Sequence, residues 1–220
     1  MSARFTKRTG GVSHGAFASL NLGTHVGDEL SDVLENRAIV AAKYGPTQYM
    51  NQVHGDRIAL IEEVTEEVPT ADALVTGIPG ITLAVMVADC IPLLLSSNES
   101  VAAVHVGRRG LVNEITRKTL SVMRDMGATE ITAIIGPAIC GSCYEVSEEI
   151  FNEVVALHPA AKSLTPAGTF ALDLPAALRE VLSDEGVSLV DKFECTVEHE
   201  EYFSYRRDGV TGRQAGVISL

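Results

Sequence analysis

The chain has 220 residues, of which 46% are hydrophobic, and its formal net charge is −12. A chain of this size can bury a substantial core, so we expect one domain spanning residues 1–220. The negative charge argues against nucleic acid or an anionic membrane as a partner, because such partners are held by basic surface.

No segment of the sequence indicates secretion or membrane insertion. The first eleven residues carry positive charge, but no apolar run follows them, and no later apolar stretch is long enough to span a bilayer. We therefore expect a cytoplasmic protein. Four cysteines in such a chain do not suggest a disulfide framework and are better considered as ligands, nucleophiles or core residues.

The first quarter of the chain predicts an irregular lead-in, a helix and a strand. The lead-in is rich in glycine and serine and contains His14 and His25, which we treat as surface residues rather than ligands. Asp32 and Glu35 form a capping-box pattern for a helix that should end at Gly45. A strand is expected at residues 58–61, just after His54 and Gly55.

The central region contains the most apolar stretches in the chain. Continuous runs at 81–87, 93–95 and 101–106 predict strands buried on both faces. Asp89 and Cys90 follow the first run, and His105 lies near the end of the last. Polar residues at the ends of buried strands are held on a rigid frame, so this region is the expected reactive site.

The rest of the chain predicts alternating helices and strands. Asn113 should begin a helix that ends at Gly127, and a buried strand should follow at 131–135. Two more helices should begin at Ser147 and Asp173. A β-rich segment is expected at 188–197, and the Asp208–Gly209 pair signals a hairpin before the last strand at 215–218. Strands and helices that do not alternate strictly favour a mixed α/β architecture.

His54, Cys90 and His105 are the candidate metal ligands. Two imidazoles and one thiolate suit zinc, and three protein ligands would leave a position for water, as in catalytic sites. Zinc lowers the pKa of such a water to ~7. Two alternatives stay open: Cys90 packs as a small hydrophobic residue beside two turn histidines, or it is a nucleophile with His105 as base and the amides of residues 107–110 as an oxyanion hole.

Two other groups of residues carry weaker signals. Cys140 and Cys143 form C-G-S-C, which could be a redox pair, but a thioredoxin-like context is not evident. The arginines are grouped at 108–109 and 206–207, with Arg213 nearby, which suits binding of a small anion in a pocket.

Ordered sequence blocks extend along almost the whole chain and include N-Q-V-H-G, A-D-A-L-V-T, A-D-C-I-P-L-L-L, H-V-G-R-R-G, G-P-A-I-C-G-S-C-Y-E-V and F-S-Y-R-R-D-G-V-T-G-R. In these blocks the chain resembles the YfiH-like family, whose members are labelled both polyphenol oxidase (laccase) domain proteins and purine nucleoside phosphorylases. The resemblance implies packed mixed β-sheets flanked by helices, and a zinc ion bound by His54, Cys90 and His105. It also implies phosphorolysis of adenosine, inosine and 5′-methylthioadenosine, and deamination of adenosine.

The sequence departs from the family pattern at one informative place. The usual H-A-G-W-R-G is H-V-G-R-R-G here, so Arg108 replaces a tryptophan and Arg109 holds the position of the family arginine. Arg109 is the first candidate for the phosphate site, followed by Arg37, Arg206 and Arg207. Asp89 is expected to orient a ligand histidine or to move protons.

Three rival functions remain open at this point. One is a copper oxidase acting on phenols, with Cu²⁺ as the alternative metal, although six histidines are few for a multicopper centre. Another is a non-enzymatic interaction module with a structural zinc. The third is amide hydrolysis on cell-wall precursors by a Cys-His pair, because a related fold in cytotoxic deamidases uses such a pair.

Overall fold

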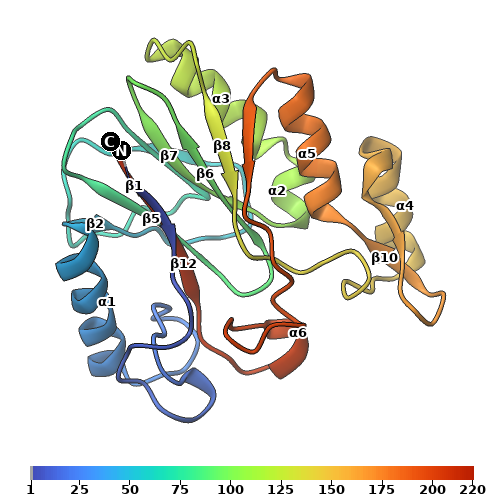
Figure 1. The fold of residues 1–220 in the computed structure, drawn as a ribbon, viewed down its shortest axis with the longest axis horizontal. Coiled ribbons are helices and arrows are strands. Elements are labelled where there is room, and N and C mark those ends of the chain that lie inside the picture. Colours follow the sequence, from blue (N-terminus) through green and yellow to red (C-terminus); the bar gives the residue numbers. More distant parts are fainter. Residues whose placement is uncertain (1) are drawn as a thin grey trace.

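The computed structural model, which describes residues 2–220, has two β-sheets packed face to face between layers of helices (Figure 1). The four-stranded sheet has the order β1 (Ser2–Phe5), β12 (Gln214–Ser219), β5 (Thr82–Val87), β2 (Thr47–Gln48). The six-stranded sheet has the order β11 (Ser188–Asp191), β8 (Thr132–Ile135), β6 (Ile91–Ser96), β7 (Val101–Val106), β4 (Ala73–Thr76), β3 (Ile58–Leu60). A separate hairpin pairs β9 (Lys162–Leu164) with β10 (Phe170–Leu172).

Helices cover the outer faces of both sheets. The α1 helix (Leu30–Tyr44) lies on the four-stranded sheet, and α2 (Arg108–Val112), α3 (Ile115–Asp125) and α5 (Leu174–Asp184) lie on the six-stranded sheet. The α4 helix (Glu148–Leu157) lies beside β10, and α6 (Tyr205–Asp208) is a single turn before β12. Two short 3₁₀ turns are η1 (Gly15–Phe17) and η2 (Pro159–Ala161).

Side-chain alternation along the strands explains the layers. Leu94 of β6 and Ala103 of β7 face the other sheet, where they meet Leu83 of β5. Their neighbours Leu93 and Val104 point the opposite way and pack under the helices. Because successive side chains in a strand face opposite sides, strands that are apolar on both faces must lie between two apolar layers. The predicted mixed α/β fold is confirmed.

Several predicted helix boundaries are confirmed by their hydrogen bonds. The Ser147 hydroxyl accepts a hydrogen bond from the Ile150 N–H at the start of α4, at 3.4 Å. The Asp173 carboxylate accepts one from the Ala176 N–H at the start of α5, at 2.8 Å. Gly45, with φ 99°, ends α1.

Three local predictions were wrong. The capping box at Asp32 does not form, because α1 begins at Leu30 and has no side-chain cap. Asn113 ends α2 instead of starting the next helix, which follows Glu114. The Asp208–Gly209 pair does not form a hairpin, because the preceding residues make the α6 turn and Gly209, with φ 69°, terminates it.

None of the helices in residues 2–220 combines the length and the apolar character needed to cross a membrane.

Candidate metal centre

His54, Cys90 and His105 come together at one end of the two sheets. Their potential ligand atoms all lie within 4.8 Å of one another. The Cys90 Sγ is 4.0 Å from the His54 Nε2, and the two imidazole rings meet edge to face with centroids 4.7 Å apart. Each residue comes from a different segment: the turn before β3, the loop between β5 and β6, and β7 itself.

The pairing of β6 with β7 explains how Cys90 reaches His105. Ile91 pairs with Val106, so Cys90, one residue earlier, lies opposite Gly107. His54 and Asp89 adopt positive φ values of 58° and 91°, which non-glycine residues adopt at an energetic cost. Strained backbone at these two positions is a common feature of binding and catalytic sites.

Gly107 leaves open the space that the three side chains surround. A Cβ atom at this position would lie 3.0 Å from the Cys90 Sγ, 3.4 Å from the His54 Cδ2 and 3.8 Å from the His105 Nε2. The donors are a thiol and two imidazoles, a set that suits zinc or copper more than a hard cation such as Mg²⁺. The residues present therefore fit a transition-metal ion.

Asp72 orients His105. The His105 Nδ1 is 2.8 Å from the Asp72 Oδ1, and both side chains are buried. The same carboxylate accepts hydrogen bonds from the backbone N–H groups of His54 and Gly55, at 2.9 and 2.7 Å. With its Nδ1 bound to a carboxylate, an imidazole presents its Nε2 lone pair to a metal.

Asp89 was expected to orient a ligand histidine or to move protons, and the contact that orients His105 is made by Asp72 instead. The Asp89 carboxylate accepts hydrogen bonds from the Thr196 hydroxyl at 2.6 Å and from the Arg206 N–H at 2.7 Å. It is thereby held at the wall of the cavity next to Cys90. Asp72 was missed, although its position just before a buried strand, in A-D-A-L-V, is of the same kind that singled out Asp89.

Cys90 and His105 favour a charged pair. Burial by itself would raise the pKa of the Cys90 thiol, but the charge and hydrogen bond of His105 outweigh it and lower that pKa to about 6. Burial likewise opposes the charged form of His105, yet the Cys90 thiolate and Asp72 raise the His105 pKa to about 9. Each partner thus favours the charged form of the other, which is the thiolate of Cys90 and the imidazolium of His105.

The three candidate ligands open into a cavity of about 330 Å³. This volume lies in the range of small-molecule sites, which is roughly 300–1,000 Å³. The lining combines aromatic and cationic groups and includes Tyr144, Tyr205, Arg108, Arg206 and Arg213. His25, treated above as a surface residue, also lines it.

Only one of the four predicted phosphate-binding arginines, Arg206, lines this cavity. Arg109 lies on the exposed side of α2, and Arg37 stacks 4.0 Å over the ring of Tyr49. Arg207 donates to the carbonyls of Thr196 and Tyr202, which fixes the loop before α6. The cavity instead contains Arg108 and Arg213.

Residues 2–220 match the sequence family described as multi-copper polyphenol oxidoreductase laccase. The chain belongs to this family. A purine nucleoside phosphorylase of Corynebacterium glutamicum is 43% identical over 228 residues, which cover 98% of this chain and 93% of the relative. The expected resemblance to the YfiH-like family is confirmed.

Solved structures of the family share the fold over almost the whole chain. A Neisseria meningitidis protein has a TM-score of 0.91 and 39% identity, covering 99% of this chain and 93% of that one. Bacillus licheniformis YfiH has a TM-score of 0.88 and 29% identity, covering 99% of this chain and 92% of its own.

Proposed function

We propose that this protein is a zinc-dependent purine nucleoside enzyme that carries out phosphorolysis of adenosine, inosine and 5′-methylthioadenosine, and deamination of adenosine. The observation that carries the proposal is the joining of a His54–Cys90–His105 donor set to a cavity lined by arginines and tyrosines. The names of the relatives supply the substrate class.

His54, Cys90 and His105 would hold the zinc ion, with Cu²⁺ as the alternative metal. Bound there, zinc would act as a Lewis acid and would lower the pKa of a coordinated water to ~7. Asp72 would keep His105 in the tautomer that offers Nε2 and would hold the His54 backbone in place. The chain thus provides a metal site with an open side facing the cavity.

The tyrosines of the cavity suit the purine base of a nucleoside, and the arginines suit the phosphate that attacks it. Tyr144 and Tyr205 would supply aromatic surface for a purine base, although the family tryptophan is replaced by Arg108. The Asp89 carboxylate suits a ribose hydroxyl, which can donate a hydrogen bond to it. In phosphorolysis a phosphate oxygen bonds to the anomeric carbon, the C–N glycosidic bond breaks, and the purine leaves with the bonding electrons and takes up a proton.

Arg206 and Arg213 are the proposed phosphate ligands, because both line the cavity in a chain whose net charge is −12. Arg206→Ala and Arg213→Ala should each raise the KM for phosphate at least tenfold and leave deamination of adenosine much less affected. Arg109→Ala is the matched control, since this exposed neighbour of Arg108 lies outside the cavity. If only Arg109→Ala raised the KM for phosphate strongly, Arg109 would be the phosphate ligand, as the sequence had predicted.

A product assay on protein of measured metal content tests the whole proposal. Adenosine with phosphate should give adenine and ribose 1-phosphate, and adenosine without phosphate should give at most inosine and ammonia. Inosine and methylthioadenosine, each with and without phosphate, complete the screen. Equal release of free adenine in phosphate-free buffer would identify a hydrolase instead.

A Cys-His hydrolase is the second candidate, because His105 lowers the pKa of Cys90 to about 6. Cys90→Ala should abolish turnover in either case. Cys90→Asp separates them, since a carboxylate can still bind zinc but cannot replace an attacking thiolate. Retained zinc with residual turnover supports the metal enzyme, and retained zinc with no turnover supports the hydrolase.

A further inference from the structure

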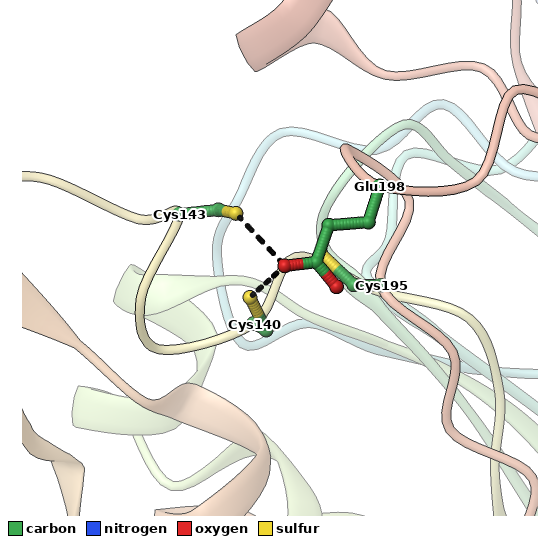
Figure 2. Close-up of side chains that lie close together, drawn as sticks. All are labelled: Cys140, Cys143, Cys195 and Glu198. Atoms are coloured by element: carbon green, nitrogen blue, oxygen red, sulfur yellow. Dashed lines mark hydrogen bonds between the residues drawn. The ribbon is translucent and has the colours of Figure 1, made fainter. Parts of the chain in front are cut away.

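A second group of candidate ligands lies beside the cavity but does not line it. Cys140, Cys143, Cys195 and Glu198 place their ligand atoms within 4.8 Å of one another. Figure 2 shows the Glu198 carboxylate between the thiols: its Oε1 lies 3.8 Å from the Cys143 Sγ and 4.0 Å from the Cys140 Sγ. None of the four lines the cavity described above.

The four residues come from two turns with the same spacing. Cys140 and Cys143 form C-x-x-C, and Cys195 and Glu198 form C-x-x-E. In each turn the carbonyl of the first cysteine accepts a backbone hydrogen bond. The Cys143 N–H donates to the Cys140 carbonyl, and the His199 N–H donates to the Cys195 carbonyl, both at 3.1 Å. Short C-x₂₋₄-C turns of this kind are the usual ligand pairs of structural zinc sites.

The backbone holds the two turns against each other. The Ala138 N–H donates to the Glu194 carbonyl at 3.1 Å, and the Thr196 N–H donates to the Ala138 carbonyl at 3.0 Å. Cys195 is buried at the base of the cluster, whereas Glu198 closes it from the exposed side. The ligand positions therefore depend on a fixed backbone and not on the chance placement of surface side chains.

We propose that Cys140, Cys143, Cys195 and Glu198 bind a second, structural zinc ion. Three thiolates select a soft or borderline metal, and the carboxylate completes four protein ligands, which closes the site to substrate. With Zn–S bonds of about 2.3 Å, the sulfurs of a tetrahedral site lie roughly 3.8 Å apart, so only small side-chain movements are needed. The four cysteines of the chain are all free thiols, which leaves these three available.

The second ion would fix one wall of the cavity. The turn at 140–143 lies between Ile139 and Tyr144, both of which line the cavity. The other turn carries Thr196, whose hydroxyl donates to Asp89 at 2.6 Å. By tying the two turns together, the ion positions these groups and takes no part in the reaction itself.

Zinc counting on the purified full-length protein tests the proposal. The protein, reconstituted with Zn²⁺ and freed of loosely bound metal, should hold two equivalents per chain. Cys140→Ser/Cys143→Ser should hold one, and so should His54→Ala. Ser142→Ala is the matched control and should keep both, because its hydroxyl contacts the Cys140 Sγ at 3.1 Å without being a ligand.

Cobalt spectra identify which ion is lost and do not depend on activity. Stripped protein titrated with Co²⁺ should develop thiolate-to-cobalt charge transfer from both sites. The larger part, from three thiolates, should persist in His54→Ala, whereas in Cys140→Ser/Cys143→Ser the band should fall to the smaller part that Cys90 gives. Glu198→Gln, which preserves shape on an exposed residue, should weaken the second equivalent at least tenfold without unfolding the chain. One zinc equivalent in both the unmodified protein and the double-serine variant would overturn the proposal, as would a Cys140–Cys143 disulfide in freshly purified protein. Neither result would affect the first site, which His54→Ala reports separately.

Discussion

At the scale of single residues, Asp72 joins the segments that carry two of the three candidate ligands. One buried carboxylate accepts hydrogen bonds from the backbone that carries His54 and from the ring of His105. It therefore places two of the three candidate ligands at once. The β4–β7 register makes this possible, since Ala73 pairs with Val104 and so sets Asp72 beside His105.

Asp72→Asn should weaken zinc binding by about 10–100-fold, the usual effect of losing a carboxylate behind a ligand histidine. The amide can no longer accept hydrogen bonds with both of its outer atoms. Competitive titration of zinc against a chelator measures the change directly, without reference to turnover. Asp56→Asn is the control, because this exposed carboxylate pairs with Lys118 on the surface. Equal zinc affinity in the Asp72 variant and the unmodified protein would contradict the positioning role.

Cys90 should be unusually reactive once metal is removed. Its pKa of about 6 lies below the usual value, so the thiolate appears as the pH rises through about 6 instead of about 8.5. Alkylation of Cys90 in stripped protein, followed on its own peptide by mass spectrometry, should therefore have a midpoint near pH 6. Added Zn²⁺ should suppress the reaction. A midpoint near the ordinary cysteine value would show that His105 does not stabilise the thiolate.

Some of these residue roles could be predicted from sequence and others could not. His54, Cys90 and His105 were proposed because their side chains are metal donors at strand ends, and the structure brings them together. The sequence could not show that Arg108, and not Arg109, lines the cavity. Neighbours on a helix point about 100° apart, and only packing decides which of them faces a cavity.

At the scale of single elements, α2 has one glycine, Gly107, at its N-cap beside the site and another, Gly110, within the helix next to the core. A Cβ at Gly107 would approach the Cys90 Sγ at 3.0 Å, whereas a Cβ at Gly110 would approach the Ile115 Cγ2 at 3.2 Å and the His105 carbonyl at 3.1 Å. A methyl group added at Gly107 therefore affects the metal site, whereas one added at Gly110 affects the packing of the helix.

Gly107→Ala should reduce zinc affinity and turnover at least tenfold with little change in thermal stability. Gly110→Ala should do the reverse and lower the melting temperature, because overpacking costs about 1–3 kcal/mol. Calorimetry and zinc titration on both variants provide the measurements. Normal zinc binding in Gly107→Ala would show that the space beside Cys90 is not needed for the metal.

Strands and helices were predicted correctly where continuous apolar runs or side-chain caps mark them in the sequence. The apolar runs of β5, β6 and β7 and the caps at Ser147 and Asp173 were correctly placed. The false hairpin at Asp208–Gly209 has a physical explanation. A glycine with positive φ serves both a hairpin turn and the end of a helix, so the same dipeptide signals both.

At the scale of the whole molecule, the hydrophobic core and not the metal should provide most of the stability. The apolar layers run between the sheets and under both sets of helices. Removing metal with a chelator should therefore abolish activity, leave the far-ultraviolet circular dichroism almost unchanged, and lower the melting temperature by the amount that ligand binding supplied. Cooperative loss of the dichroism signal on metal removal would contradict this expectation.

The pairing of the two sheets was not accessible from sequence patterns. In the four-stranded sheet β12 lies between β1 and β5, so strands from the two ends of the chain are neighbours. Strand signals give the length and burial of a segment but do not specify its distant partner. The resemblance to a known family supplied the packed-sheet arrangement that local patterns did not.

The cavity residues extend from His25 to Arg213, nearly the full length of the chain. During synthesis, a growing chain can thus have no functional site until its final strand has emerged and inserted between β1 and β5. A chain shortened before β12 would lack a strand of the four-stranded sheet and the adjoining Arg213 of the cavity wall. The proposed catalytic activity would therefore return during refolding only after contacts between the most distant segments of the chain have formed.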